Sequence, residues 1–278
     1  MNKRSEICSL IDHENPHILA LTEFGAASSV NDGELGIEGY SIYRRNHSNG
    51  SGGPGKGVAL YVNDKLSHSS CTLFDSVTYD CSAWCTILLS DGKRLLVGVV
   101  YRSPNSQDEN NKNMLDILRI TANAKYDYLL VCGDFNLPRI DWIGNECHDT
   151  ESSFTANFMD TIEQLEWYQH SKNNTRFRGT QKSCLDLIFT NEEEMISKVH
   201  ELPPIGKSDH ICQKWEVTVK EAIFKNTTRM RPNYKRAKWE EIKDDIKGFM
   251  LQPEDNVGVK TDKFLAMIDS SRDKNIPL

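Results

Sequence analysis

The sequence of 278 residues lacks any long hydrophobic run, and this absence limits what the protein can be. No stretch approaches the roughly 18 apolar residues that indicate a membrane-spanning helix, so no membrane span is expected. The N-terminus, Met1–Ser5, leads into a mixed polar segment and has none of the apolar core of a signal peptide. We therefore expect a protein that is neither secreted nor embedded in a membrane.

The eight cysteines include no Cys-x-x-Cys pair, which is a common spacing in zinc sites. In a chain without a secretion signal they are expected to be reduced thiols and not a disulfide framework. The chain also lacks an excess of basic residues, since its formal net charge is −7. Acidity argues against a nucleic-acid binder, which is usually basic. Acidic side chains gathered around a divalent metal would reconcile this charge with nucleic-acid binding, because the bound ion inverts the local charge.

What is present is an ordinary globular composition, with 38% hydrophobic and 26% charged residues. The composition changes near residue 221, where a basic stretch begins. Trp239, Ile242 and Ile246 then mark one face of a helix. We expect one domain over residues 1–220, followed over 221–278 by a basic linker and an amphipathic helix.

Hydrophobic periodicity indicates alternating strands and helices in the first domain. Asp91-Gly92 between two apolar runs is a strong hairpin signal. The pattern suggests an α/β sandwich with two sheets in the middle. Strands are expected at 18–21, 40–43, 58–62, 84–89, 94–101, 128–131, 185–191 and 211–219, helices at 4–14, 108–124 and around Phe154–Leu165, and a loop at 25–39.

The chain is organised around the segment from Tyr128 to Asn136, where an apolar run ends in a glycine and two polar side chains. Gly133 removes a side chain where something approaches closely. The pleat sends Asp134 and Asn136 to the same side, where they can hold a water and a phosphate oxygen. The alternative is a strand followed by an Asx turn, since Asp, Asn and Pro138 all favour turns.

Other strands also end in polar side chains. Glu23 follows the run Ile18–Leu21 and is either a surface residue or an inward-facing ligand. Asp186 lies between two leucines, where an unpaired carboxylate is costly to bury, so it requires a partner. His210 supplies one, and a histidine paired with an aspartate is a candidate general acid or base.

Thr175–Gly179 is a basic and aromatic segment containing Arg176, Phe177 and Arg178. It is either a solvated loop or a surface that contacts phosphates and stacks on bases. The sequence alone leaves both interpretations open.

Four segments, taken in the order in which they occur along the chain, resemble motifs of the endonuclease/exonuclease/phosphatase superfamily. The resemblance covers about residues 2–219. The four segments are Leu21–Glu23, Gly133–Asn136, Leu185–Ile188 and Ser208–His210. Within that superfamily the chain is similar to the endonuclease domain of a non-LTR retrotransposon. The supporting segments are Asn15–Glu23, Gly57–Val62, Tyr101–Pro104 and Leu185–Asn191, with a tail at Tyr234–Trp239 similar to the linker into a reverse transcriptase.

The resemblance implies a four-layer α/β sandwich in which two mixed or antiparallel sheets are flanked by helices. It also implies hydrolysis of a phosphodiester in duplex DNA with Mg²⁺, or with Mn²⁺ as a substitute. By the same resemblance, Glu23 would bind the metal, and Asp209 would lie in the metal or water shell. Asp134 would activate the water and Asn136 would bind the phosphate, while His210, oriented by Asp186, would stabilise charge or transfer a proton. Tyr101 would donate a hydrogen bond, and the residues implied in substrate binding are Arg102, Arg176, Phe177 and Arg178.

Two alternatives stay open beside a DNA endonuclease. One is a hydrolase of a small phosphoester, such as an inositol phosphate, and the other is a catalytically impaired remnant that binds nucleic acid or a partner. An enzyme acting on genomic DNA is expected in the nucleus, otherwise in the cytoplasm, with a reverse transcriptase domain in the parent protein. The family's first strand, with its Asn, is expected to be missing, because Asn2-Lys3 match the pair that follows it.

Overall fold

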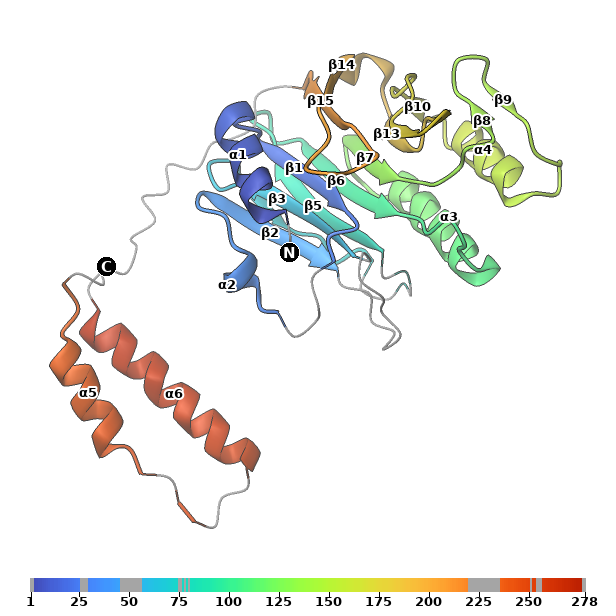
Figure 1. The fold of residues 1–278 in the computed structure, drawn as a ribbon. Coiled ribbons are helices and arrows are strands. Elements are labelled where there is room, and N and C mark those ends of the chain that lie inside the picture. Colours follow the sequence, from blue (N-terminus) through green and yellow to red (C-terminus); the bar gives the residue numbers. More distant parts are fainter. Residues whose placement is uncertain are drawn as a thin grey trace. The chain divides into compact units, whose positions relative to one another are not determined.

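A computed structural model describes residues 3–25, 30–45, 57–74, 77, 79, 81–219, 236–250, 252–253 and 257–276 (Figure 1). The chain forms two compact units, Met1–Lys225 and Asn226–Leu278. Each unit is described by itself below.

The larger sheet of the first unit has six strands in the order β10-β13-β7-β6-β5-β4. Strand β7 lies at its centre, parallel to β6 and antiparallel to β13. The strands are β10 (Tyr168–Gln169), β13 (Asp186–Thr190), β7 (Tyr128–Asp134), β6 (Arg94–Tyr101), β5 (Ser82–Leu88) and β4 (His68–Ser70). The centre is almost continuously apolar, as expected for strands covered on both faces.

The smaller sheet has three antiparallel strands in the order β1-β3-β2. They are β1 (Ile18–Thr22), β3 (Val58–Asn63) and β2 (Tyr40–Arg45). The two sheets enclose a core in which Val58 and Leu60 of β3 pack with Val97 and Val99 of β6. Alternating apolar residues on strands from both sheets therefore form the middle of the fold.

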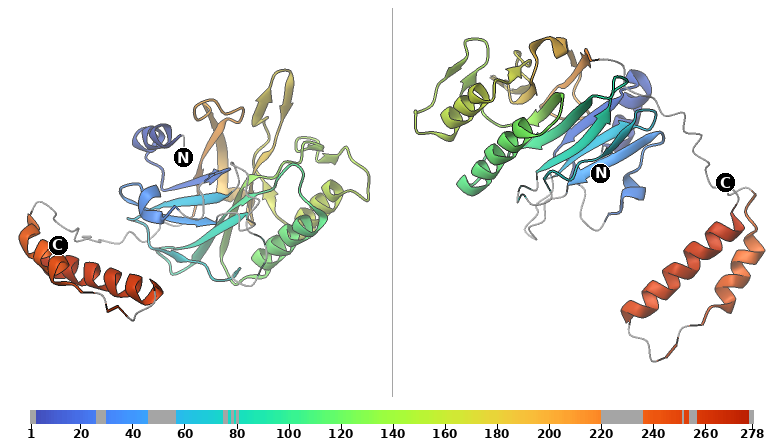
Figure 2. Two further views of the ribbon diagram at one scale, coloured as in Figure 1. Left: turned by 60° about the horizontal axis from the view of Figure 1, so that its bottom comes forward. Right: turned by 180° about the vertical axis from the view of Figure 1, so that it is seen from behind.

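Helices cover the outer faces of the two sheets (Figure 2). Ile7 and Ile11 of α1 pack against Tyr61 of the smaller sheet, while Met114 of α3 and Phe158 of α4 belong to the core on the larger sheet. The helices are α1 (Arg4–Glu14), α2 (Asp32–Leu35), α3 (Asp108–Asn123) and α4 (Phe154–Gln164). This arrangement confirms the predicted α/β sandwich with sheets in the middle and helices outside.

Short hairpins complete the unit. They are β8 (Ile140–Asp141) with β9 (Glu146–Cys147), β11 (Arg176–Arg178) with β12 (Gln181–Ser183), and β14 (Ile196–Leu202) with β15 (Cys212–Val217), and the 3₁₀ turn η1 (Glu193–Met195) precedes β14. The sequence did not predict β14, because its exposed positions carry Ser, Lys, His and Glu. The loop predicted at 25–39 is wrong where α2 lies, since Asn31 and Glu34 form a capping box there.

The second unit is a helical hairpin of α5 (Trp239–Gly248) and α6 (Val257–Asn275). The first helix was predicted and the second was not. Ser271 donates a hydrogen bond to Asp245 at 2.7 Å, and Phe249 contacts Phe264 with ring centroids 5.9 Å apart. The predicted basic linker falls mainly on residues 220–235, which lie outside the described part of the chain.

All eight cysteines lie in the described part of the chain, and none of them is in a disulfide there. None of the described helices combines the length and hydropathy that crossing a bilayer would require.

Candidate active site

The site is centred on Asp134, the last residue of the central strand β7. Its neighbour Gly133 has φ +143°, and a Cβ built there would lie 1.8 Å from the Val100 carbonyl oxygen. Only glycine therefore lets the end of β7 pack so closely on β6. The result confirms that Gly133 marks a close approach, here of a neighbouring strand.

The register of the sheet places two other polar residues beside Asp134. Tyr101 pairs with it across β6, and Asp186 pairs with it across β13. Two carboxylates directly opposite each other on neighbouring strands repel, so this arrangement is unfavourable for the sheet alone. Asp134 is nevertheless only 3% exposed.

Asn136 holds the Asp134 carboxylate from the turn that follows. Its backbone N–H donates to Asp134 Oδ1 at 3.0 Å, and its Nδ2 donates to Asp134 Oδ2 at 2.9 Å. Nδ2 also donates to the Arg102 carbonyl at 2.8 Å, so both amide hydrogens are in use. The two side chains meet because Asn136 has φ +49°, a left-handed conformation that asparagine tolerates.

Arg102 lies beneath this turn and is only 8% exposed. Its Nε donates to Asn111 Oδ1 at 2.8 Å, and its Nη1 donates to the Asn136 carbonyl at 3.1 Å. Its guanidinium carbon also lies 4.8 Å from the centroid of the Phe154 ring. In this structure Arg102 therefore supports the Asn136 turn, and its role in substrate binding stays a prediction.

Asp186 and His210 form a hydrogen-bonded pair, with His210 Nδ1 2.8 Å from Asp186 Oδ2. The pair leaves His210 Nε2 as the nitrogen available to a substrate. Ligand atoms of Asp134, Asp186 and His210 lie within 4.8 Å of one another, which makes the three a group that could hold a metal ion.

The electrostatics follow from burial and from the crowding of acids. Burial, followed by the charge of Asp186, raises the pKa of Asp134 from 3.8 to about 7. Burial alone would lower the pKa of His210, but its hydrogen bond to Asp186 and the surrounding carboxylates together raise it. Near neutral pH the site therefore holds a carboxyl group that titrates in that range and a histidine biased toward its cation.

Glu23 enters the site from the end of β1 and has φ +51°. Tyr101 donates a hydrogen bond from its hydroxyl to Glu23 Oε1 at 2.9 Å. Burial, together with the charge of Glu23, raises the pKa of Tyr101 well above its ordinary value, so the phenol stays protonated and a donor. Tyr101 therefore orients Glu23 in this structure.

Asp209 lies beside His210 but points to a different partner. Arg176 Nε donates to Asp209 Oδ2 at 2.9 Å, and this bond lowers the pKa of Asp209. Phe177 N–H donates to the Asp209 carbonyl at 2.8 Å, and Arg176 forms a β-bridge with His210. The basic and aromatic segment is thus part of the β11–β12 hairpin, attached directly to the segment that carries His210.

Thr175 is a positioning residue whose role was not predicted from the sequence. It is fully buried, and its Oγ1 accepts hydrogen bonds from the N–H groups of Leu185 and Asp186, both at 3.0 Å. Its carbonyl accepts from Ile211 N–H at 2.9 Å. Thr175 therefore joins the β11–β12 hairpin, the start of β13 and the start of β15. A single threonine has no periodicity or spacing that would reveal such a role.

The structure brings together Asp134, Asn136, Asp186 and His210, with Glu23 and Tyr101 alongside. The residues Arg176, Phe177 and Asp209 lie on the adjoining hairpin, with Arg178 at its end. Glu23 and Asp209, the two predicted metal ligands, are not members of the Asp134–Asp186–His210 group. The carboxylates of that group suit a hard divalent cation, which prefers oxygen ligands.

Comparison with known proteins gives the class to which this fold and site belong. Residues 1–210 match the sequence profile of the Endonuclease/Exonuclease/phosphatase family, so the chain belongs to that family of hydrolytic enzymes. Comparison with curated proteins gives no significant match.

Solved structures similar to the chain include the endonuclease domain of TRAS1, a telomere-specific non-LTR retrotransposon. It is 16% identical, with a TM-score of 0.58, covering 79% of this chain and 94% of that one. The Xenopus laevis APE2 catalytic domain is 15% identical, with a TM-score of 0.59, covering 82% and 91%. A family protein from Leptotrichia buccalis is 16% identical, with a TM-score of 0.55, covering 79% and 94%. These similarities establish the fold.

Proposed function

We propose that the chain is a DNA endonuclease that nicks duplex DNA by metal-dependent hydrolysis of a phosphodiester. The observation that carries this proposal is the attachment of the β11–β12 hairpin to the segment bearing His210. A substrate held on this hairpin would lie next to the Asp134–Asp186–His210 group. A hydrolase of a small phosphoester has no need of this extended surface.

The hairpin offers side chains suited to a nucleic acid. Phe177 lies between Arg176 and Arg178 on strand β11, and it is 41% exposed. Lys182 on the partner strand lies 5.9 Å from the centroid of its ring. Exposed aromatic rings stack on bases, and neighbouring cations contact phosphates. These features supply local positive charge on a chain whose net charge is −7.

The side chains of the site have chemically distinct parts in this proposal. Asp134 accepts a proton from the attacking water, and the pKa of its buried carboxyl is raised in the metal-free protein. His210 donates from Nε2 to a phosphate oxygen, while Asp186 holds the ring through Nδ1. To bind the phosphate through Nδ2, Asn136 would have to release one of its two present acceptors. Its observed contacts support a role in orienting Asp134.

Mg²⁺ is the proposed cofactor, with Mn²⁺ as a substitute, and the Asp134–Asp186–His210 group would hold it through its carboxylates, because His210 uses Nδ1 for Asp186 and Nε2 for the phosphate. A bound cation supplies positive charge for the phosphate and for the attacking water. Glu23 would add a carboxylate from the end of β1, oriented by Tyr101.

Incubation with supercoiled plasmid and Mg²⁺ tests the proposal directly. We expect open circles, and we expect EDTA to prevent their formation. A folded sample that nicks no plasmid with Mg²⁺ or Mn²⁺ would contradict the proposal. Salt-dependent DNA binding without turnover would instead indicate the catalytically impaired binding protein.

A pair of substrates separates an endonuclease from a small-phosphoester hydrolase. We expect Phe177→Ala to slow plasmid nicking by roughly tenfold, since one stacked base contributes about 1–3 kcal/mol. Hydrolysis of bis(p-nitrophenyl) phosphate should stay within about twofold of the wild type. Tyr168→Ala is a matched control, because Tyr168 is also exposed, at 43%, but lies on β10. Phosphate release from an inositol phosphate without plasmid nicking would favour the alternative.

A further inference from the structure

Strand β11 is paired on both of its edges. One edge forms the ladder with β12, and the other contacts the segment that carries His210. On that second edge, backbone hydrogen bonds of 2.8 and 2.9 Å flank the β-bridge between Arg176 and His210. Two residues placed between such bonds form a non-hydrogen-bonded pair, with Cα atoms about 4.5 Å apart. Their side chains project from the same face, so Arg176 and His210 are direct cross-strand neighbours.

The guanidinium of Arg176 is held on one edge and open on the other. Its Nε donates to Asp209 Oδ2 at 2.9 Å, and the side chain is 29% exposed. Within the described part of the chain, Nη1 and Nη2 have no hydrogen-bond partner. The donors of both terminal nitrogens are therefore available, in the planar arrangement that matches two oxygens of a phosphate.

The backbone that carries this guanidinium is fixed to the candidate active site. Thr175, the residue before Arg176, accepts hydrogen bonds from the N–H groups of Leu185 and Asp186. Asp186 in turn holds the His210 ring at 2.8 Å. Groups held in this way lose little freedom when a substrate binds. Arg176 and the Asp186–His210 pair therefore form one preorganised unit.

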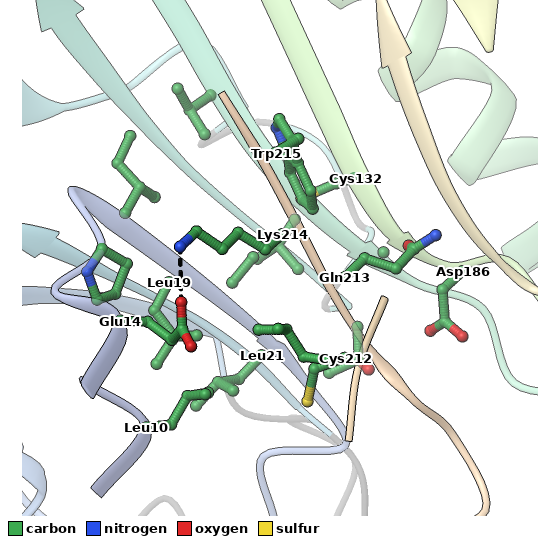
Figure 3. A pocket seen from close by; sticks show the side chains of 18 of the residues that line it. Leu10, Glu14, Leu19, Leu21, Cys132, Asp186, Cys212, Gln213, Lys214 and Trp215 are labelled. Atoms are coloured by element: carbon green, nitrogen blue, oxygen red, sulfur yellow. Dashed lines mark hydrogen bonds and ion pairs between the residues drawn. The ribbon is translucent and has the colours of Figure 1, made fainter. Parts of the chain in front are cut away.

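The next cation along the chain is already engaged elsewhere. Lys214 is the first basic residue after His210, and it lies on β15. Its Nζ lies 2.6 Å from Glu14 Oε2, and Figure 3 shows this ion pair directed away from Asp186. Arg176 is therefore better placed than Lys214 to bring positive charge to a phosphate beside His210.

We propose that Arg176 binds the phosphate that is hydrolysed, through Nη1 and Nη2, and that Asp209 positions Arg176 by holding Nε. This inference rests on the proposed phosphodiester hydrolysis, and it gives the reacting phosphate a second protein donor beside His210. The carboxylates of the site repel a phosphate, so a cation fixed next to them favours its binding. A bidentate contact from arginine also fixes the orientation of the phosphate. Arg176 is thus a catalytic residue, and Asp209 is a positioning residue.

This role separates Arg176 from the rest of the β11–β12 hairpin. Phe177 stacks on a base in the proposed function, so only DNA would use it. Arg176 contacts a group that every phosphodiester contains. Loss of Arg176 should therefore slow the hydrolysis of small and large substrates alike, whereas loss of Phe177 should slow plasmid nicking alone.

The experiment compares variants of the full chain on plasmid and on bis(p-nitrophenyl) phosphate with Mg²⁺. We expect Arg176→Gln to lower kcat/KM by about 10- to 100-fold on both substrates. Arg176→Lys should recover only part of the loss, because it keeps the charge without the planar fork. Arg119→Gln is the matched control, since Arg119 also pairs with an aspartate, Asp116 at 3.3 Å, but lies on α3. An effect of Arg176→Gln confined to plasmid, or no larger than that of Arg119→Gln, would overturn the proposal.

A second variant separates contact with the phosphate from support of the hairpin. Asp209→Asn leaves Nε of Arg176 an uncharged acceptor, so we expect a smaller loss than for Arg176→Gln. The double variant should be no slower than Arg176→Gln alone, because Asp209 acts through Arg176. Equal losses for the two single variants would assign Arg176 a purely structural role. A higher Mg²⁺ requirement for Asp209→Asn would make Asp209 a metal ligand, and either result would overturn the proposal.

A binding measurement distinguishes failure of this inference from failure of the proposed function. Inorganic phosphate is titrated with Mg²⁺ present and followed by phosphorus NMR. We expect saturable line broadening with the wild type and with Arg119→Gln, and binding at least about fivefold weaker with Arg176→Gln. A protein that hydrolyses neither substrate but shows this pattern would contradict the proposed function alone. Phosphate binding that is absent, or equal in the wild type and Arg176→Gln, would overturn the role of Arg176.

Discussion

Neutralising Asp134 should stabilise the metal-free protein at alkaline pH while abolishing its activity. The native pKa is about 7, against 3.8 for an ordinary aspartate. Between these values the native state binds more protons than the unfolded state, so stability falls as pH rises through this window. At 1.36 kcal/mol per pKa unit, the carboxylate destabilises the native state by about 4 kcal/mol above pH 7.

Asp134→Asn removes this charge but also changes the hydrogen bonds. The new amide still accepts from Asn136 N–H, while its NH₂ group faces the donor Nδ2 of Asn136, now 2.9 Å from Oδ2. An unmatched buried donor costs about 1–3 kcal/mol. The variant should therefore be more stable than the wild type by about 1–3 kcal/mol at pH 8. The advantage should disappear near pH 5, where the wild-type carboxyl is mostly protonated.

Thermal and urea unfolding in EDTA at pH 5 and pH 8 measure this difference. A gain of about 1–3 kcal/mol in a domain of this size corresponds to roughly 3–10 °C in Tm at pH 8. Asp141→Asn is the control, because hydrogen bonds from Gly144 and Ile143 lower the pKa of that surface carboxyl. A lowered pKa adds stability above its ordinary range, so this control should show no gain at pH 8. An Asp134→Asn variant that melts below the wild type at both pH values would refute the reasoning.

Further predictions concern the other side chains of the site. We expect His210→Ala to reduce hydrolysis by roughly 100-fold or more with the fold intact by circular dichroism, and near-wild-type turnover would remove His210 from the mechanism. Because its pKa is raised and its cation is the proposed active form, the rate should fall as pH rises through that raised pKa; a rate that continues to rise would indicate a general base instead. Thr175→Val leaves the N–H groups of Leu185 and Asp186 without their acceptor. We expect a loss of about 2–3 kcal/mol in urea unfolding, with Thr175→Ser close to the wild type, and equal stability of both variants would argue against the role assigned to Thr175.

The elements that sequence patterns predict well are those whose signals are local. The periodicity of α1, the continuous apolar run of β3 and the Asp91-Gly92 turn before β6 all depend on neighbouring residues. Helix α2 also has a local signal, the capping box of Asn31 and Glu34, but the helix is only four residues long within a polar segment. Strand β14 gains its stability from pairing with β15, a contact that no local pattern contains.

The residues of the site were likewise predictable only where their signals are local. The order of polar residues at strand ends pointed to Asp134, Asp186 and His210, and the structure brings them together. Register is a property of pairing between distant strands, so the sequence could not place Asp186 directly opposite Asp134. It also could not show that Arg102 is buried, because an arginine after a strand usually reaches solvent.

Several unfavourable placements occur together at this site, and their coincidence supports a functional role independently of motifs. Asp134 is buried opposite a second carboxylate, which costs stability unless a cation compensates. Glu23 adopts φ +51°, a left-handed conformation that lacks the advantage asparagine has at Asn136 and costs of order 1 kcal/mol or more. This conformation directs the Glu23 carboxylate toward the same end of the sheet, where Tyr101 donates a hydrogen bond to it. The strain and the repulsion do not improve packing, and together they concentrate negative charge at the group of side chains that could hold a metal ion.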